Sequence, residues 1–132
     1  MIVADTNLIA YLLMPGPRAD AAKAVYDHDH EWVAPRLWRS EFRSVLVQHL
    51  RHSGLARALA DEAWATASAL ITEREPPPEA VLDTALAGPL SAYDAEFAAL
   101  AMQLGVSLVT DDKRLRAAVP TIAVSLDEFV AP

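Results

Sequence analysis

The sequence predicts an α/β fold in which helices cover both faces of a mainly parallel sheet. Short apolar segments alternate with longer segments of helical periodicity along the whole chain, as parallel sheets with helical crossovers require. The 132 residues fit one compact domain and leave no room for a second. We therefore expect a single domain over residues 1–132.

In the first half of the chain the pattern predicts two strands and four helices. The strands are short, over residues 2–4 and 32–34. Asp5-Thr6-Asn7 supplies capping residues for the first helix, Pro15-Gly16-Pro17 ends it, and Gly54 separates the last two. The first helix is expected over residues 8–13, and the second from the end of the Pro15-Gly16-Pro17 segment to about residue 26. The third and fourth are expected over residues 35–52 and 55–71.

The second half predicts three helices and two strands. The prolines at 76–78 form a rigid connector and not a domain boundary, because too little chain follows to fold alone. Gly105 ends the longest helix of this half. The helices are expected near residues 79–87, over 92–104 and around Leu115, and the strands over 106–109 and 122–124.

Three acids follow predicted strands directly. Asp5 comes after the first strand, and Asp111 and Asp112 come after the strand at 106–109. Ligands of open parallel sheets bind beyond the carboxyl ends of the strands, so these acids are candidate site residues. A purely structural interpretation of Asp5, as a cap of the next helix, stays open.

A fourth acid, Glu41, lies on the apolar side of its helix. At 3.6 residues per turn it falls between Leu37 and Val45, whereas Arg39, Arg43 and Arg51 face away. The apolar arc consists of Leu37, Trp38, Phe42, Val45, Leu46, His49 and Leu50. A buried ion pair with an arginine is the structural alternative, and the helical phase disfavours it.

A fifth acid, Asp94, is predicted at the edge of a buried stripe, with Glu96 and Gln103 on the opposite face. A carboxylate that faces a core is costly unless it is paired, hydrogen-bonded or metal-bound. The stripe is expected to contain Tyr93, Phe97, Leu100, Ala101 and Leu104.

Clustered carboxylates, without cysteine and without a well-placed histidine pair, suit hard cations such as Mg²⁺ or Mn²⁺. One or two such ions can activate water for cleavage of a phosphodiester bond. The residues thus predict a metal-dependent nuclease site.

The net charge of −7 and the isoelectric point near 4.9 argue against tight, nonspecific binding of nucleic acid. Bound cations would neutralise part of the acidity. Most basic residues fall in two segments that also carry candidate acids. The candidates for RNA contact are Arg36, Arg39, Arg43, Lys113 and Arg114.

With these residues located, the chain resembles the PIN-domain family, and within it the VapC-type toxins of bacterial toxin–antitoxin pairs. The resemblance covers almost the whole chain in the correct order. It rests on residues 3–9, Ser40-Glu41-Phe42, residues 91–95, residues 108–112 and the closing residues 124–129.

The resemblance implies a three-layer α/β/α sandwich and an acidic quartet that binds Mg²⁺ or Mn²⁺ and cuts RNA. It assigns Thr6 and Asn7 to support of the first acid, and Thr110 to the last acid or the attacking water. Asp111 is expected as an auxiliary metal ligand. The quartet is Asp5, Glu41, Asp94 and Asp112.

The resemblance also implies partners: an RNA substrate, a second copy of the chain, and an antitoxin whose tail occupies the site. It places the antitoxin groove on the helices between residues 35 and 71. No apolar run approaches the roughly 20 residues of a membrane span, and residues 1–5 lack the features of a signal peptide. With no cysteine, we expect a cytoplasmic protein.

Three alternatives remain. A housekeeping RNA-processing PIN nuclease would share the chemistry but not the substrate. A non-catalytic PIN-like interaction module would keep the scaffold without turnover. A phosphatase or phosphotransferase using Asp5 as nucleophile is disfavoured, because such sites commonly need a second acid where Asn7 stands.

One histidine and two tryptophans are interpreted as residues outside the catalytic site. His49 is expected as a hydrogen-bonded core residue and Trp38 as core, whereas Trp64 is expected near a dimer or antitoxin surface.

Overall fold

A computed structural model describes all 132 residues and shows one sheet of five parallel strands. The spatial order is β3-β2-β1-β4-β5, and every neighbouring pair is parallel. The strands are short: β1 Ile2–Ala4, β2 Trp32–Ala34, β3 Thr72–Glu73, β4 Leu108–Val109 and β5 Ala123–Val124.

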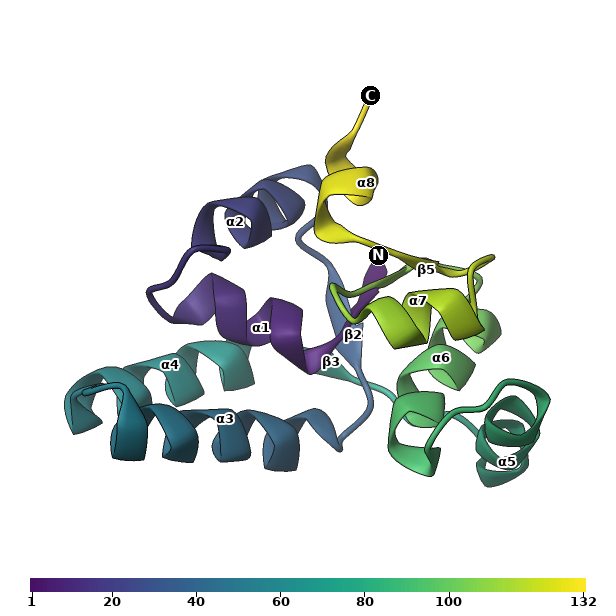
Figure 1. The fold of residues 1–132 in the computed structure, drawn as a ribbon, viewed down its shortest axis with the longest axis horizontal. Coiled ribbons are helices and arrows are strands. Elements are labelled where there is room, and N and C mark those ends of the chain that lie inside the picture. Colours follow the sequence, from purple (N-terminus) through teal and green to yellow (C-terminus); the bar gives the residue numbers. More distant parts are fainter.

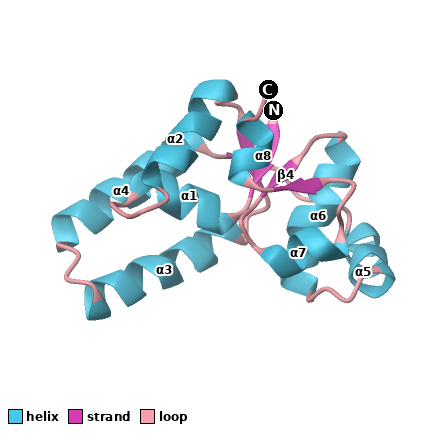
Figure 2. Ribbon diagram, turned by 45° about the horizontal axis from the view of Figure 1, so that its top comes forward, coloured by secondary structure: helices cyan, strands magenta, loops and turns pink.

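Helices cover both faces of this sheet, so the predicted three-layer α/β/α sandwich is confirmed. Figure 1 shows α1 to α4 on one side of the strands and α5 to α7 on the other, and Figure 2 shows the same division from a second direction. The helices are α1 Thr6–Leu13, α2 Ala19–His28, α3 Trp38–His52, α4 Arg57–Leu70, α5 Pro78–Ala87, α6 Ala92–Leu104, α7 Lys113–Ala118 and α8 Leu126–Val130.

The strand order reverses direction between β1 and β4. From β1 the chain adds β2 and β3 on one side, and then α5 and α6 carry it back to β4 on the other side of β1. Ala4 pairs with Val109 in this central ladder, so the residues that follow both strands emerge side by side. Such a reversal is where open parallel sheets bind ligands.

Small residues let α6 lie close against the centre of the sheet. Ala95, Ala98, Ala99 and Ala101 are buried along this helix, which contacts both β1 and β4. Phe97 supplies the bulk that fills the remaining space, and it is 1% exposed. The close approach of α6 brings its first turn to the carboxyl ends of the central strands.

The predicted element boundaries hold to within a few residues, with three differences. Residues 35–37 form a turn in which the carbonyl of Pro35 accepts from the amide of Trp38, so α3 begins later than expected. Pro78 begins α5 instead of belonging to the connector, since a proline at the first helical position loses no hydrogen bond. The strand expected over 106–109 is paired only at Leu108–Val109.

Two elements were not predicted. β3 is a two-residue edge strand with exposed side chains, so no apolar pattern marks it. The helix α8 begins after Ser125, whose hydroxyl accepts from the amide of Glu128. The Ser-x-x-Glu spacing is the signal that could have predicted it. No helix is both long and apolar enough to cross a membrane.

Candidate active site

Four of the predicted acids line a single pocket of about 350 Å³ at the carboxyl ends of β1 and β4. They come from four different segments: the end of β1, α3, α6, and the loop after β4. We call this hollow the acidic pocket; its lining carboxylates are those of Asp5, Glu41, Asp94 and Asp112.

Asp5 is the most buried of these acids, at 8% exposed. Its Oδ1 accepts from the amide of Thr6 at 2.9 Å, and its Oδ2 accepts from the Thr110 hydroxyl at 2.6 Å. Burial raises the pKa of Asp5 to about 6; the bonds from Thr110 and Thr6 lower it, and the charges of Glu41 and Asp94 raise it further. Asp5 thus caps α1 as the structural interpretation required, and it also faces the acidic pocket.

Thr110 organises the centre of the site. Its fully buried hydroxyl donates to Asp5 and accepts from the amide of Asp112 at 3.0 Å and from Nδ2 of Asn7 at 3.2 Å. Asn7 Nδ2 also lies 3.4 Å from Asp5 Oδ2, whereas its buried Oδ1 has no partner. One threonine therefore connects the ends of β1 and β4.

Glu41 is half-buried and has no arginine partner. Its Oε1 accepts from the Thr6 hydroxyl at 2.8 Å. Burial raises the pKa of Glu41, the bond from Thr6 lowers it, and the charge of Asp94 raises it. The arginines nearest to it in the sequence contact other residues: Arg39 makes two bonds to Glu73, at 2.7 and 2.8 Å, and Arg43 lies over the ring of Trp64.

Asp94 lies in the first turn of α6, where the hydroxyl of Ser91 accepts from its amide at 3.1 Å. Burial raises the pKa of Asp94, the charge of Asp112 adds to the increase, and Arg114 acts in the opposite direction. Asp112 caps α7: its Oδ1 accepts from the amides of Arg114 and Leu115, at 2.9 and 3.1 Å. Its second carboxylate oxygen accepts no bond from the protein.

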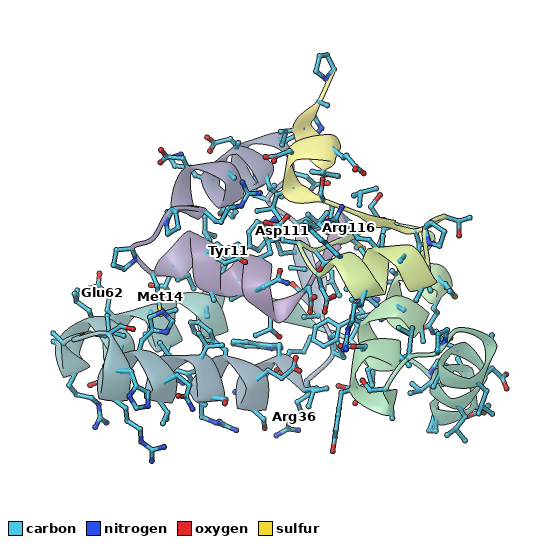
Figure 3. The ribbon with its side chains drawn as sticks, viewed as in Figure 1. Tyr11, Met14, Arg36, Glu62, Asp111 and Arg116 are labelled. Atoms are coloured by element: carbon cyan, nitrogen blue, oxygen red, sulfur yellow. The ribbon has the colours of Figure 1, made fainter.

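Asp111 does not line the acidic pocket. Its Oδ2 accepts from Nε of Arg18 at 2.9 Å, and its Oδ1 lies 3.4 Å from the amide of Leu126 at the start of α8. Figure 3 shows Asp111 on the side of the molecule where α8 lies, whereas Arg36 lies on the side of α3. Asp111 thus forms an ion pair with Arg18 outside the acidic pocket, and its role as an auxiliary metal ligand stays a prediction.

Two residues of α6 differ from the predicted helical phase. Tyr93 lies in the first turn of α6 and is 65% exposed, so it does not belong to the buried stripe. Glu96 is half-buried instead of solvent-facing, and burial together with the charges of Glu75 and Glu41 raises its pKa. Glu96 is an acid near the site that helical phase had placed on the wrong face.

The candidate RNA-contact residues fall into two groups. Arg36, Arg43, Lys113 and Arg114 are exposed. Arg39 is only 34% exposed and is neutralised by Glu73 on β3, so it is not a free cation.

The predictions for His49 and Trp38 are confirmed, whereas the expected place of Trp64 at a dimer or antitoxin surface stays a prediction. His49 is half-buried and its Nδ1 lies 3.0 Å from the carbonyl of Val45, as expected for a core residue. Trp38 is fully buried. Trp64 is half-buried and stacks on Trp38 and Phe42 between α3 and α4, so it contributes to the packing of these helices.

The donor chemistry of the acidic pocket fits a hard divalent cation. All four acids offer oxygen ligands, and none of the ion pairs in the structure involves them. No three of the carboxylates converge on one point as the side chains stand. Binding an ion would therefore require some of these side chains to move.

Comparisons with known proteins agree with this architecture. Among solved structures, PAE2754 from Pyrobaculum aerophilum superposes with a TM-score of 0.76 at 22% identity, over 98% of this chain and 91% of that one. FitAcB from Neisseria gonorrhoeae superposes with a TM-score of 0.69 at 18% identity, over 96% of this chain and 98% of that one. None of the curated proteins compared matches the sequence.

The family comparison extends over most of the chain. The model of the PIN domain matches residues 2–119, which include the whole acidic pocket. PIN domains are generally nucleases. The chain belongs to the PIN domain family.

Proposed function

We propose that this protein is a Mg²⁺- or Mn²⁺-dependent endoribonuclease that hydrolyses RNA phosphodiester bonds, and that it is the toxin of a toxin–antitoxin pair. The observation that carries the proposal is the acidic pocket itself. Four carboxylates from four segments meet where the strand order reverses, and no basic side chain forms an ion pair with any of them. A structural cluster of this kind would be costly without a cation.

Asp5, Glu41, Asp94 and Asp112 would hold one or two ions. A bound ion supplies an activated water and stabilises the negative charge that develops on the phosphate. The protein's own contribution is orientation. Thr110 and the amide of Thr6 fix both oxygens of Asp5, and the Thr6 hydroxyl holds Glu41. With a pKa of about 6, Asp5 is mostly ionised at neutral pH and can serve as a ligand.

The RNA backbone would be held by cations outside the pocket. Arg114 lies close enough to Asp94 to affect its pKa, and Lys113 is its exposed neighbour on α7. Arg36 and Arg43 are exposed on the α3 side. Separate cations at the rim can position phosphates without giving the whole molecule a basic surface.

Cleavage of structured RNAs with Mn²⁺ or Mg²⁺ tests the nuclease proposal. We expect Asp5→Asn and Asp94→Asn to lose at least 100-fold in rate, whereas Asp83→Asn, on the exposed face of α5, should cut like the wild type. Equal cleavage by all four proteins would overturn the proposal. If calorimetry also showed no divalent-ion binding, a non-catalytic interaction module would be the better interpretation.

The toxin role rests on the resemblance to VapC-type toxins, and it separates this proposal from a housekeeping nuclease. The antitoxin groove is predicted on α3 and α4. A hollow of about 350 Å³ between α1 and α3, lined by Tyr11, Met14, Val45 and His49, adjoins α3 and offers a surface for an antitoxin segment. A gene for a small antitoxin beside this one, whose product suppresses cleavage and binds this surface, is the expected finding. Cleavage of one stable RNA precursor without such a partner would favour the housekeeping role. A homodimer is part of the same proposal and is tested by light scattering.

A further inference from the structure

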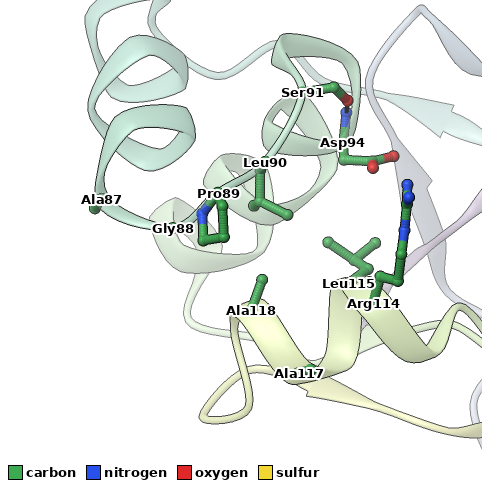
Figure 4. Close-up of a pocket in the computed structure, with 10 residues that line it drawn as sticks. All are labelled: Ala87, Gly88, Pro89, Leu90, Ser91, Asp94, Arg114, Leu115, Ala117 and Ala118. Carbon is green, nitrogen blue, oxygen red and sulfur yellow. Dashed lines mark hydrogen bonds between the residues drawn. The ribbon is translucent and has the colours of Figure 1, made fainter.

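A second hollow adjoins the acidic pocket and shares Asp94 with it. It has a volume of about 560 Å³ and lies between the α5–α6 turn and α7, as Figure 4 shows. This volume is within the roughly 300–1,000 Å³ of sites that bind small organic groups. We call it the α5–α7 hollow; its lining includes Gly88, Leu90, Ser91, Asp94, Arg114 and Leu115.

The α5–α7 hollow has an apolar part and a charged end. Figure 4 shows Leu90 and Leu115 pointing toward each other across it, and the guanidinium of Arg114 on the same side as the Asp94 carboxylate. The hollow thus combines apolar walls with one exposed cation. A nucleotide is complementary to this hollow, because its base is flat and largely apolar on its faces whereas its phosphate is anionic.

The short helix α7 connects this hollow to the acidic pocket. Asp112 caps the helix and lines the acidic pocket, and Arg114 and Leu115 follow within one turn and line the hollow. A strand of RNA whose phosphate lies at the four carboxylates would therefore bring a neighbouring nucleotide to the hollow.

We infer that the α5–α7 hollow binds the base of an unpaired RNA nucleotide next to the scissile phosphate, with Arg114 contacting the backbone phosphate. The inference rests on the proposed nuclease function. Bases are available for such binding only where they leave the helical stack, so the substrate is single-stranded at the cut. Because the walls carry few side-chain donors and acceptors, selection acts through the presence and size of the base more than through its hydrogen-bonding edge.

Gly88 provides a direct way to fill the hollow. Its backbone is extended, with φ −114° and ψ 150°, so any residue can adopt it. A Cβ there would meet the carbonyl oxygen of Ala118 at 3.5 Å and Leu90 Cγ at 3.9 Å, which are ordinary contacts. Gly88→Ala should therefore fold normally, and Gly88→Leu should place a larger side chain in the hollow.

The test compares a single-stranded RNA with the same RNA made abasic at each nucleotide beside the mapped cut. For the wild type we expect kcat/KM to fall about tenfold or more when the base on one side is removed. Gly88→Leu should cut the intact RNA about tenfold more slowly than the wild type and should not distinguish it from that abasic RNA. The rate at which Gly88→Ala cuts the intact RNA should lie between the rates of the wild type and of Gly88→Leu. Gly16→Leu, where a Cβ would have no neighbour within 4 Å, is the matched control and should behave like the wild type.

The outcomes separate this inference from the proposed function. If the wild type cuts RNA but treats intact and abasic substrates alike, or if both Gly88 variants behave like the wild type, the base site is wrong and the nuclease stands. If the wild type cuts no RNA, the proposed function fails, and fluorescence anisotropy of the same two RNAs decides whether a base is bound. Equal affinity for both RNAs in the wild type overturns the inference. Should Gly88→Leu not fold, Gly88→Ala carries the comparison with a smaller expected change.

Discussion

At the scale of single residues, the central feature is the buried carboxylate of Asp5, whose ionised form is disfavoured by the fold. Asp5 is hydrogen-bonded at both oxygens, yet burial still raises its pKa to about 6. A group whose pKa rises on folding favours the folded state in its protonated form. The ionised carboxylate that the proposed metal site needs is therefore destabilising in the metal-free protein.

The first prediction concerns this carboxylate and pH. Because the pKa of Asp5 rises from 3.8 to about 6 on folding, its contribution to stability is greatest below pH 4 and falls as the pH rises to about 6. We expect metal-free Asp5→Asn to be more stable than the wild type at pH 7.5, by about 1–3 kcal/mol, and the difference to vanish near pH 4. Urea unfolding in EDTA at both pH values measures this. A variant that is less stable than the wild type at pH 7.5 would contradict it.

Thr110 shows how much of the site depends on one hydroxyl, since it contacts Asp5, Asn7 and Asp112. We predict that Thr110→Val, which keeps the shape, weakens Mn²⁺ binding at least tenfold and raises the pKa of Asp5 further. Titration calorimetry between pH 5.5 and 8 measures both effects. Thr84→Val, a buried threonine on α5 far from these contacts, is the matched control. Unchanged Mn²⁺ affinity in Thr110→Val would show that the hydroxyl is only a packing group.

At the scale of elements, the loop after β4 is held from two sides. Thr110 ties it to β1, and Asp111 ties it to Arg18, which also lies 3.6 Å from Asp127 on α8. The loop carries Asp112 into the acidic pocket. The ion pair of Asp111 is thus a positioning contact for the neighbouring acid.

The prediction at this scale is made for Arg18→Met. Partly exposed ion pairs contribute about 0–1 kcal/mol, so the free energy of unfolding should change little. The amide of Asp112, which donates to Thr110, should nevertheless exchange its hydrogen faster because the loop loses one attachment. Lys23→Met removes an exposed ion pair with Asp27 within α2 and is the control. If both variants exchange alike at Asp112, the contact does not position the loop.

The pair α3 and α4 is held together by aromatic side chains. Trp38, Phe42 and Trp64 pack together with ring centroids 5.5–6.3 Å apart, and Trp64 stacks on the other two rings. Arg43 covers Trp64 from outside, 5.2 Å from the ring centroid. This packing fixes the phase of α3, and with it the direction in which Glu41 faces.

At the scale of the whole molecule, folding and metal binding should be coupled. A ligand that binds only the folded state stabilises it by about 2.7 kcal/mol at 100 times its Kd. We predict that Mn²⁺ raises the Tm of the wild type at pH 7.5, and that the shift is smaller at pH 5 because Asp5 is then largely protonated. Differential scanning fluorimetry measures this, with Asp5→Asn as the variant expected to lose most of the shift. A Tm that does not respond to Mn²⁺ at any pH would contradict a metal site in this pocket.

The sequence by itself predicted the four acids that line the acidic pocket, because local rules govern where they fall. Asp5 and Asp112 follow strands directly, and the helical phase of Glu41 puts it among apolar residues. Periodicity placed most elements to within a few residues. It failed at Tyr93 and Glu96, because phase shows which residues share a helix face but not which elements cover that face, and α5 packs against α6. It also did not place Asp111, whose partner Arg18 is distant along the chain.

Only the tertiary structure decided which distant segments of the chain are neighbours. The crossover that sets β4 against β1 joins Thr110 to Asp5, and the alanines of α6 bring Asp94 to the same place. The α5–α7 hollow likewise arises from a turn and a helix that are about 25 residues apart in sequence and carry no common motif. Such contacts depend on the summed packing of many apolar side chains, which no local pattern encodes. The physical reason for the division is therefore range: caps and helical phase act within a few residues, whereas pockets form between segments that only the folded core brings together.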